Sequence, residues 1–248
     1  MSYSPPPGAY RIDVGDETAA AYRIVLDNYR LVIELALLPA LIVLAAEFVA
    51  LILPGGIIAR VLGALIQAAA LLIFGTVFPV RWHRFVLLGE SVAGGLFPPG
   101  WSEFLIASIK LGVLIVAGWI VLGVVAVLPP HILTLPLTFA GGIALTLAAM
   151  RVALIFPAAA VERPVGLTTA WGWIAGNFWR LFVCLVVCYL PFAVAGYVVI
   201  SIGAVFPGPF WIVFAALRLA VSFAGAAVVA ALLSHIYRGL GSAPSAGT

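Results

Sequence analysis

Ionisable side chains inside otherwise apolar segments are the first candidates for chemistry in this chain. A charge surrounded by hydrocarbon is costly, so such residues are usually paired or functional. The apolar segments contain Glu34, Glu47, Arg60, Lys110, Arg151 and Arg218. Glu34 lies near enough to a segment end to reach water, and Arg60 can extend outward past the turn at 54–56. An ion pair between Glu47 and Arg60 across that turn is geometrically reasonable.

Arg151 and Arg218 lie deeper in their segments and have no acidic neighbour on the same segment. Two interpretations stay open. In the first, both side chains are structural: they bond carbonyls freed by helix prolines, or they pair with Glu34 or Glu47. In the second, they line a polar cavity that holds an anionic headgroup or a solute. We therefore treat Arg151, Arg218, Glu34, Glu47 and Arg60 as a candidate intramembrane polar site.

A basic and aromatic cluster follows the second apolar segment. Basic and aromatic side chains at a membrane surface are typical of an anchor for anionic lipid headgroups. The predicted headgroup-contacting residues are Arg81, Trp82, His83, Arg84, Trp171 and Arg180. An alternative hypothesis is a membrane enzyme in which His83 and Glu90 converge as acid and base.

The sequence contains no other signal of catalysis or metal binding. None of the common spacings for a zinc protease, a serine hydrolase or a phosphate-binding loop is present. His83 and His235 are expected on one side of the membrane and His131 on the other, so they cannot share a metal. Cys184 and Cys188, one helical turn apart, are predicted to be small buried hydrophobes. We predict no enzyme, no catalytic or metal-binding residue and no cofactor.

Composition identifies the class of protein to which these residues belong. Hydrophobic residues make up 65% of the 248 residues and charged residues 8%, and the mean hydropathy is +1.25. So few charges cannot cover a soluble globule, and so many apolar residues exclude intrinsic disorder. The net charge of +3 comes from basic residues scattered at segment ends, not from a stripe, so no nucleic-acid partner is predicted.

Six apolar segments are long enough to span a bilayer as helices. They cover about 31–53, 57–80, 103–128, 132–157, 181–205 and 210–235. The predicted fold is all-α, a polytopic membrane bundle of six transmembrane helices arranged as three parallel hairpins. Short amphipathic interfacial helices are expected at 17–30 and 166–180. Residues 17–240 are predicted to form one membrane domain between flexible tails at 1–16 and 241–248.

The distribution of arginine predicts the orientation of the bundle. The turns at 54–56, 129–131 and 206–209 carry no Lys or Arg, whereas the other connections and the terminal segments do. The positive-inside rule then places both termini and the longer loops in the cytoplasm. A repeat agrees with hairpins that point the same way: an aromatic residue, then Asn six positions later, then another aromatic residue precedes both the first and the fifth segment.

The stretch from Arg151 through Pro157 and Glu162 to Arg180 resembles YciC-like membrane proteins. It also resembles the membrane domain attached to some glycerophosphodiester phosphodiesterases. The stretch from Phe78 to Glu90 is similar to uncharacterised inner-membrane proteins of comparable length. The resemblance implies a multi-pass bacterial inner-membrane protein, and no catalytic residue carries over from the fused phosphodiesterases.

The sequence thus predicts a non-enzymatic membrane protein that binds lipid or a protein partner as a scaffold in the bacterial inner membrane. Its expected partners are the lipid bilayer with anionic headgroups, and a protein partner or a second copy of the chain. The alternative is a small transporter or permease subunit with a polar cavity near Arg151 and Arg218.

Overall fold

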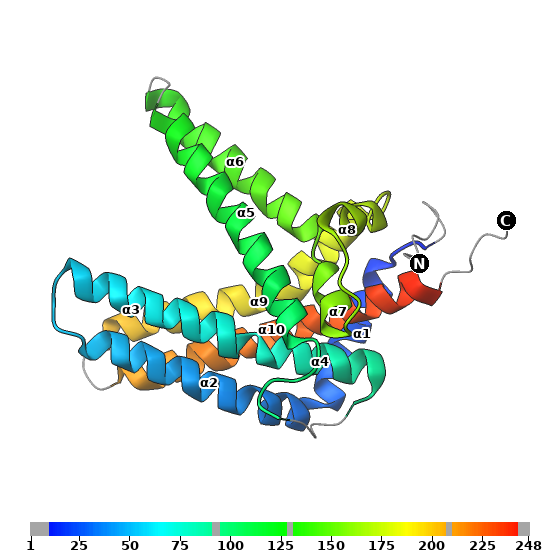
Figure 1. Ribbon diagram of the computed structural model, residues 1–248, viewed down its shortest axis with the longest axis horizontal. Helices are drawn as coiled ribbons and strands as arrows, with labels where there is room; N and C mark the ends of the chain where they lie inside the picture. The colour runs from blue at the N-terminus through cyan, green and yellow to red at the C-terminus, as the bar shows by residue number, and fades with distance from the viewer. Residues whose placement is uncertain (1–9, 91–94, 128–130, 207–209, 243–248) are drawn as a thin grey trace.

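The computed structural model describes residues 10–90, 95–127, 131–206 and 210–242, and across them it contains helices and no strand (Figure 1). In chain order the helices are α1 (Val14–Asp27), α2 (Tyr29–Ile52), α3 (Ile57–Ala70), the π-helical turn η1 (Leu71–Gly75), α4 (Val77–Leu88), α5 (Trp101–Val127), α6 (His131–Arg151), α7 (Ile155–Ala160), α8 (Leu167–Trp173), α9 (Phe178–Val205) and α10 (Trp211–Ser242).

Six of these stretches are long and apolar enough to cross a membrane: α2, α3 with η1 and α4, α5, α6, α9 and α10. They pair as the hairpins α2–α3, α5–α6 and α9–α10. The ends of α2, α5 and α9 all lie on one side of the molecule, and the described ends of the chain lie on the other (Figure 1). The predicted all-α bundle of three parallel hairpins is confirmed, and the chain is an integral membrane protein.

The second spanning stretch is longer than the sequence predicts. It continues through η1 and α4 to Leu88 instead of ending near residue 80. The helix ends where Gly89 adopts a φ of 69° and its amide donates to the Phe85 carbonyl at 2.9 Å. Glycine is favoured at such a left-handed helix end. The basic and aromatic residues 81–84 do not end the helix, and three of them, Trp82, His83 and Arg84, are buried against other helices.

A π-helical turn in this stretch is held by the start of α5. A π turn leaves carbonyls outside the regular ladder. The indole Nε1 of Trp101 donates to the Ile73 carbonyl at 3.1 Å and approaches the Thr76 hydroxyl at 3.1 Å. The Thr76 hydroxyl in turn donates to the Leu72 carbonyl at 2.8 Å. Trp101, the first residue of α5, therefore packs against the π turn.

The fourth spanning helix ends at Arg151, six residues earlier than predicted. After α6, the amides of Val152 and Ala153 donate to carbonyls three residues back instead of four, which ends the α-helical pattern. Helix α7 then begins at Ile155. Pro157 has no amide hydrogen and its ring would collide with the carbonyl of Ala153 in a continuous helix. Pro157 instead lies in the first turn of α7, where a proline is tolerated.

The N-terminal segment is ordered and packed from residue 10 onward, so the prediction of a flexible tail through residue 16 is wrong for residues 10–16. Ile12 is buried, and its amide donates to the Asn177 side chain at 3.1 Å. Asp13 caps α1 by accepting from the amide of Asp16 at 3.1 Å. Residues 1–9 and 243–248 of the predicted tails lie outside the described residues, and α10 extends to Ser242.

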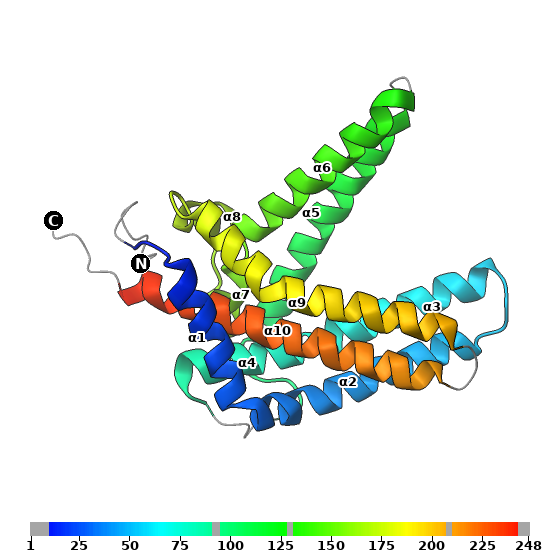
Figure 2. The same ribbon diagram turned by 180° about the vertical axis from the view of Figure 1, so that it is seen from behind.

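Helix α1 crosses α10 at a steep angle and packs against α9 and α10 (Figure 2). Its packed face carries the buried residues Glu17, Thr18 and Ala21. Tyr22 lies at the edge of this face, whereas Tyr29 belongs to α2 and is exposed. The helix exists where an interfacial helix was expected, and contacts with the bundle hold it there.

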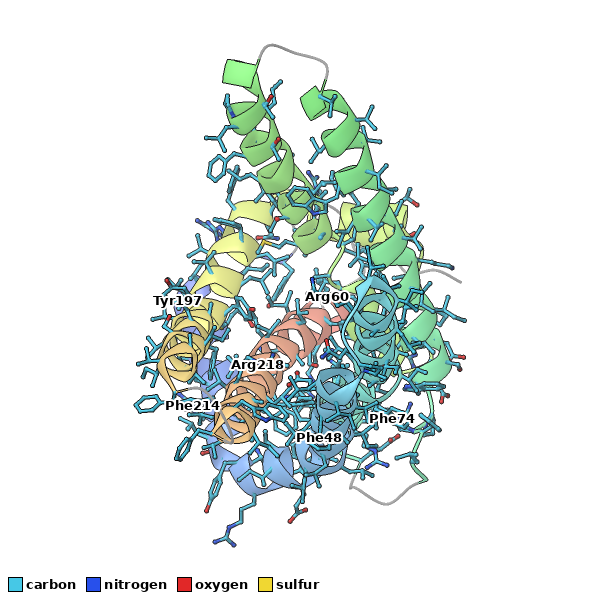
Figure 3. The ribbon with its side chains drawn as sticks, turned by 90° about the vertical axis from the view of Figure 1, so that its left-hand side faces the viewer. Phe48, Arg60, Phe74, Tyr197, Phe214 and Arg218 are labelled. Atoms are coloured by element: carbon cyan, nitrogen blue, oxygen red, sulfur yellow. The ribbon has the colours of Figure 1, made fainter. Side chains whose placement is uncertain are left out.

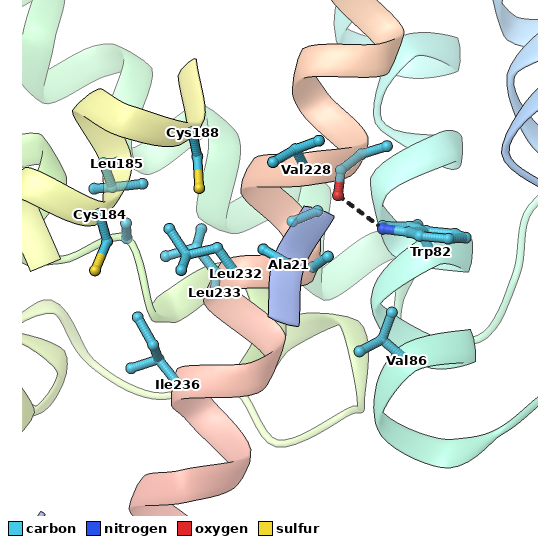
Figure 4. Packing of buried hydrophobic residues seen from close by; sticks show 14 of the residues in the cluster. Ala21, Trp82, Val86, Cys184, Leu185, Cys188, Val228, Leu232, Leu233 and Ile236 are labelled. Carbon is cyan, nitrogen blue, oxygen red and sulfur yellow. Dashed lines mark hydrogen bonds between the residues drawn. The ribbon is translucent and has the colours of Figure 1, made fainter. Parts of the chain in front are cut away.

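The main core surrounds α10, which packs against α1, α2, α4, α7 and α9 (Figure 4). Trp82 from α4 and Leu232 from α10 are fully buried there. Cys184 and Cys188 are free thiols buried in the same cluster, so the prediction that they are buried hydrophobes is confirmed.

The α5–α6 hairpin diverges from the other four spanning helices (Figure 1). None of the residues in the most apolar stretch of either helix is buried in the chain, compared with 28% for α2 and 22% for α9. The hairpin is held mainly at its base, where α5 packs against α7 and α4. The hairpin therefore presents most of its surface to whatever surrounds the protein.

Gly100 allows the close approach at that base and should be sensitive to substitution. It has a φ of 76°, and a Cβ atom would overlap the carbonyl of Ala160. Left-handed strain in a residue other than glycine costs about 1–3 kcal/mol. We expect Gly100→Ala to lower the free energy of unfolding by at least that amount in detergent denaturation. Gly112→Ala, which adds its methyl to open space on α5, is the matched control and should not destabilise the protein. Equal stability of the two variants would contradict this account.

Candidate functional site

Arg84 joins three segments at the base of the bundle. Its Nε and Nη2 donate to the two carboxylate oxygens of Glu90 at 2.6 and 2.7 Å. Its Nη1 donates to the carbonyls of Ala160 at 3.0 Å and Pro99 at 3.3 Å, and lies 3.5 Å from Glu162. The side chain is only 10% exposed. Arg84 therefore connects α4, the segment before α5 and the end of α7, and its donors are used within the protein.

Trp82 and His83 are also buried. The indole Nε1 of Trp82 donates to the Ala227 carbonyl on α10 at 2.9 Å (Figure 4). His83 Nδ1 lies 2.7 Å from the Ser234 hydroxyl, also on α10. The prediction that Trp82, His83 and Arg84 contact lipid headgroups is wrong. These residues look like a surface cluster in the sequence, but α10 and α7 cover the helix that carries them.

The hypothesis of an enzyme centred on His83 and Glu90 is wrong as well. His83 bonds Ser234, while both oxygens of Glu90 bond Arg84, so the two side chains do not converge. His83 and Ser234 are 2% and 0% exposed, which leaves no surface on this pair for a substrate. Their hydrogen bond satisfies two buried polar groups between α4 and α10.

Arg81 and Arg180 are half-buried and each bonds a backbone carbonyl. Arg81 Nη2 donates to Gly95 at 2.6 Å, and Arg180 Nη1 donates to Ile12 at 3.0 Å. The first bond attaches the segment before α5 to α4, and the second attaches the segment before α1 to α9. Contact of Arg81 and Arg180 with lipid headgroups stays a prediction.

Glu47 and Arg218 form an ion pair that joins α2 to α10. Their side chains are 18% and 33% exposed. The neighbouring rings of Phe48 and Trp211 stack with centroids 6.1 Å apart. Figure 3 shows Phe48, Arg60 and Arg218 near the end of the bundle that carries the hairpin turns.

Arg60 is not the partner of Glu47, so that predicted ion pair is wrong. Arg60 is exposed on α3 and forms no ion pair with the residues that the structure describes. Packing of α10 against α2 brings Arg218 to Glu47. This agrees with the structural interpretation of Arg218, in which it pairs with an acidic residue of the first spanning helix.

The five candidate polar residues do not form one site. Glu34 is exposed on α2, and no ion pair to it is present in the described part of the chain. Arg151 ends α6 far from the hairpin turns, whereas Arg218 lies about 10 Å beyond the start of α10 at 1.5 Å per residue. The two arginines are therefore at opposite ends of the bundle. A single polar cavity shared by Arg151 and Arg218, as the transporter hypothesis requires, is not formed.

Arg151 has aromatic neighbours in place of an acidic partner. Its guanidinium lies 4.2 Å from the ring centroid of Trp171 and 5.6 Å from that of Phe178. No carboxylate among the described residues comes within ion-pair distance, and the buried Nε has no hydrogen-bond partner there. Cation–π contact stabilises the charge in part, but it satisfies none of the N–H donors. This is the one described intramembrane arginine with such a stack and an unsatisfied buried nitrogen.

An apolar groove runs beside the Arg151–Trp171 stack, between α5, α6 and α8. It is lined by Leu111, Leu114, Ile115, Leu145, Ala148, Ala149, Val152, Leu167, Thr168 and Trp171. Trp171 belongs both to the stack and to the groove. In the sequence, Arg151 belongs to the candidate polar site and Trp171 to the predicted headgroup-contacting residues. The predicted topology puts both residues on the same side of the membrane, and this was the only indication in the sequence that they could be in contact.

A second polar cluster, missed in the sequence, attaches the N-terminal segment to α10. The Glu17 carboxylate accepts from the Tyr10 hydroxyl and lies 2.6 Å from His235 Nδ1. Its side chain is 8% exposed. Burial, together with the Glu17 carboxylate, raises the pKa of Tyr10 above its usual value of 10.0. Because His235 lies 218 positions after Glu17, no local pattern could reveal the cluster.

Comparisons of the chain with protein-family models, curated proteins and solved structures find no match. Within the described residues, no group of three His, Cys, Asp or Glu side chains is arranged to hold a metal ion. The site must therefore be interpreted from its own geometry.

The Glu47–Arg218 pair predicts a specific order of stabilities. Glu47→Gln leaves Arg218 without its counter-charge, and we expect it to lower the free energy of unfolding by about 1–3 kcal/mol. The double variant Glu47→Leu with Arg218→Leu removes both charges and should be closer to the wild type than the single variant. Glu34→Gln, at an exposed position on the same helix, is the control and should have little effect. Thermal unfolding in detergent measures all three, and a double variant less stable than Glu47→Gln would refute the pairing.

Proposed function

We propose that this protein is a non-enzymatic, multi-pass protein of the bacterial inner membrane that binds lipid through its α5–α6 hairpin. The proposal is carried by one observation: the most apolar stretches of both helices have no residue buried in the chain. A protein that needed the hairpin only for stability would pack it against the other four helices.

The outward surface of the hairpin has the chemistry of a lipid-facing surface. Large aliphatic and aromatic residues there are more than half exposed: Val113, Val116, Ile120, Val121, Val124 and Phe139. An apolar surface this large is far above what a protein leaves open to water. Because the hairpin diverges from α9 and α3, lipid can reach it from several directions (Figure 3).

The orientation and the family remain part of this proposal. Arginines concentrate at the end of the bundle that carries the described chain ends, for example Arg11, Arg23 and Arg163. The positive-inside rule supports a cytoplasmic position for that end. Kinship with the YciC-like membrane proteins is proposed on the residues from Arg151 to Arg180, in which Arg151 ends α6 and Pro157 lies in the first turn of α7.

Oxygen accessibility at a spin label distinguishes lipid from a protein partner. We expect a nitroxide at Val116→Cys to be as accessible to oxygen as one at Tyr197→Cys, an exposed position on α9, because oxygen concentrates in lipid. Both variants should carry Cys184→Ala and Cys188→Ala, and the protein should be reconstituted in vesicles. Accessibility at Val116 far below that at Tyr197 would mean that a partner helix or a second copy covers the hairpin, and the lipid-binding proposal would fail.

Reporter fusions test the proposed orientation. Green fluorescent protein fused after Ser242 should fluoresce, because it folds in the cytoplasm. Alkaline phosphatase inserted after Gly55, in the arginine-free turn, should be active because it requires export. The same phosphatase inserted after Gly89 is the control and should be inactive. The reverse pattern of activities would place the termini outside the cytoplasm.

A further inference from the structure

We propose that the Arg151–Trp171 stack and the groove beside it bind one anionic phospholipid, with the phosphate at the Arg151 guanidinium and an acyl chain in the groove. This inference rests on the proposed function, because it requires lipid to reach the α5–α6 hairpin. To the proposed lipid binding it adds the position of the site, the negative charge of the headgroup and a stoichiometry of one lipid per chain.

The charge of Arg151 calls for an anion. Guanidinium remains protonated in proteins and carries five N–H donors. The buried Nε of Arg151 has no hydrogen-bond partner among the described residues, and none of their carboxylates is within ion-pair distance. By contrast, Arg84 and Arg218 both have carboxylate partners, and the half-buried Arg81 and Arg180 each bond a backbone carbonyl. Arg151 is thus a half-buried cation that lacks a counter-charge in the protein.

The aromatic neighbours of Arg151 favour a phosphate as that counter-charge. The rings of Trp171 and Phe178 lie 4.2 and 5.6 Å from the guanidinium carbon and restrict the guanidinium group. A guanidinium held against aromatic rings keeps its edge available for hydrogen bonds in its own plane. That edge matches two oxygens of a phosphate, which it can bind in bidentate geometry.

The groove provides a place for the apolar part of the same molecule. Its lining is aliphatic except for Trp171 and the Thr168 hydroxyl. Trp171 forms the boundary between cation and groove, so a ligand bound at both must be amphipathic. Arg151 is the last residue of α6, at the end of the hairpin where a headgroup lies if α6 spans the membrane. A phospholipid satisfies both requirements at once, whereas a soluble phosphate would leave the groove unfilled.

Lipid retention in native mass spectrometry tests the site directly. Detergent-solubilised protein is titrated with equal amounts of phosphatidylglycerol and phosphatidylcholine. We expect the wild type to retain one phosphatidylglycerol in preference to phosphatidylcholine. Arg151→Gln should weaken phosphatidylglycerol binding about tenfold, which corresponds to about 1.4 kcal/mol, and abolish the preference. Arg23→Gln removes an exposed arginine on α1 that has no described partner, and as the matched control it should retain the preference.

A groove variant separates the two halves of the site. Ala148→Phe places a ring where the acyl chain would lie, and we expect it to weaken binding of both lipids while Arg151 is intact. Arg151→Lys keeps the charge but loses bidentate geometry, and it should bind phosphatidylglycerol with intermediate strength. It also tests the site if Arg151→Gln fails to fold. Displacement of phosphatidylglycerol by soluble glycerol phosphate at equal concentration would overturn the proposal in favour of a soluble-anion site.

The outcomes also separate this site from the proposed function. If Arg151→Gln keeps the wild-type preference, or if Arg23→Gln loses it equally, the site is wrong. If the spin label at Val116 is nevertheless in contact with lipid, the proposed function is supported and only the phospholipid site at Arg151 is rejected. If the label reports a protein contact, the proposed function itself fails.

Discussion

The structure depends most on the burial of one short stretch of α4 against the helices around it. Arg84 bonds Glu90 and the carbonyl of Ala160, while Trp82 and His83 bond α10 on the other side. A buried guanidinium is tolerated only when its donors are satisfied, so the segments that satisfy it must stay in place. The base of the α5–α6 hairpin is attached through these same contacts.

Because the base is held so firmly, the hairpin can diverge from the bundle above it. The close approach of Gly100 to Ala160 and the bonds from Trp101 to Ile73 and Thr76 determine where α5 begins. Beyond that point, α5 and α6 make most of their contacts with each other. A rigid base with an uncovered hairpin is suited to holding lipid at a defined place, next to Arg151.

Much of the fold was predictable because lipid leaves few options to a polypeptide. All six spanning helices overlap the six apolar segments, since length and apolarity alone identify such helices. The candidate site was predictable only in part. Arg151 and Arg218 are recognisable in the sequence as residues that need partners, and Glu47 is one candidate partner of Arg218, but the sequence does not decide between the candidates. Glu47 was assigned to Arg60, its neighbour across a turn, whereas Arg218 lies 171 residues away in the chain.

By itself, the sequence determined the class of protein, the number of its spanning helices and their pairing into hairpins, and which charges needed an explanation. These features follow from composition and spacing, because the free-energy cost of placing a charge or an unpaired backbone group in hydrocarbon depends on the residues of one segment. Only the tertiary structure decided which basic residues are buried. The sequence places Arg84 in a surface cluster and Arg151 inside an apolar segment, yet Arg84 is buried and bonded to carboxylate and carbonyl groups, whereas Arg151 is stacked on Trp171 without a counter-charge. That difference arises from contacts between distant segments, which no local pattern records.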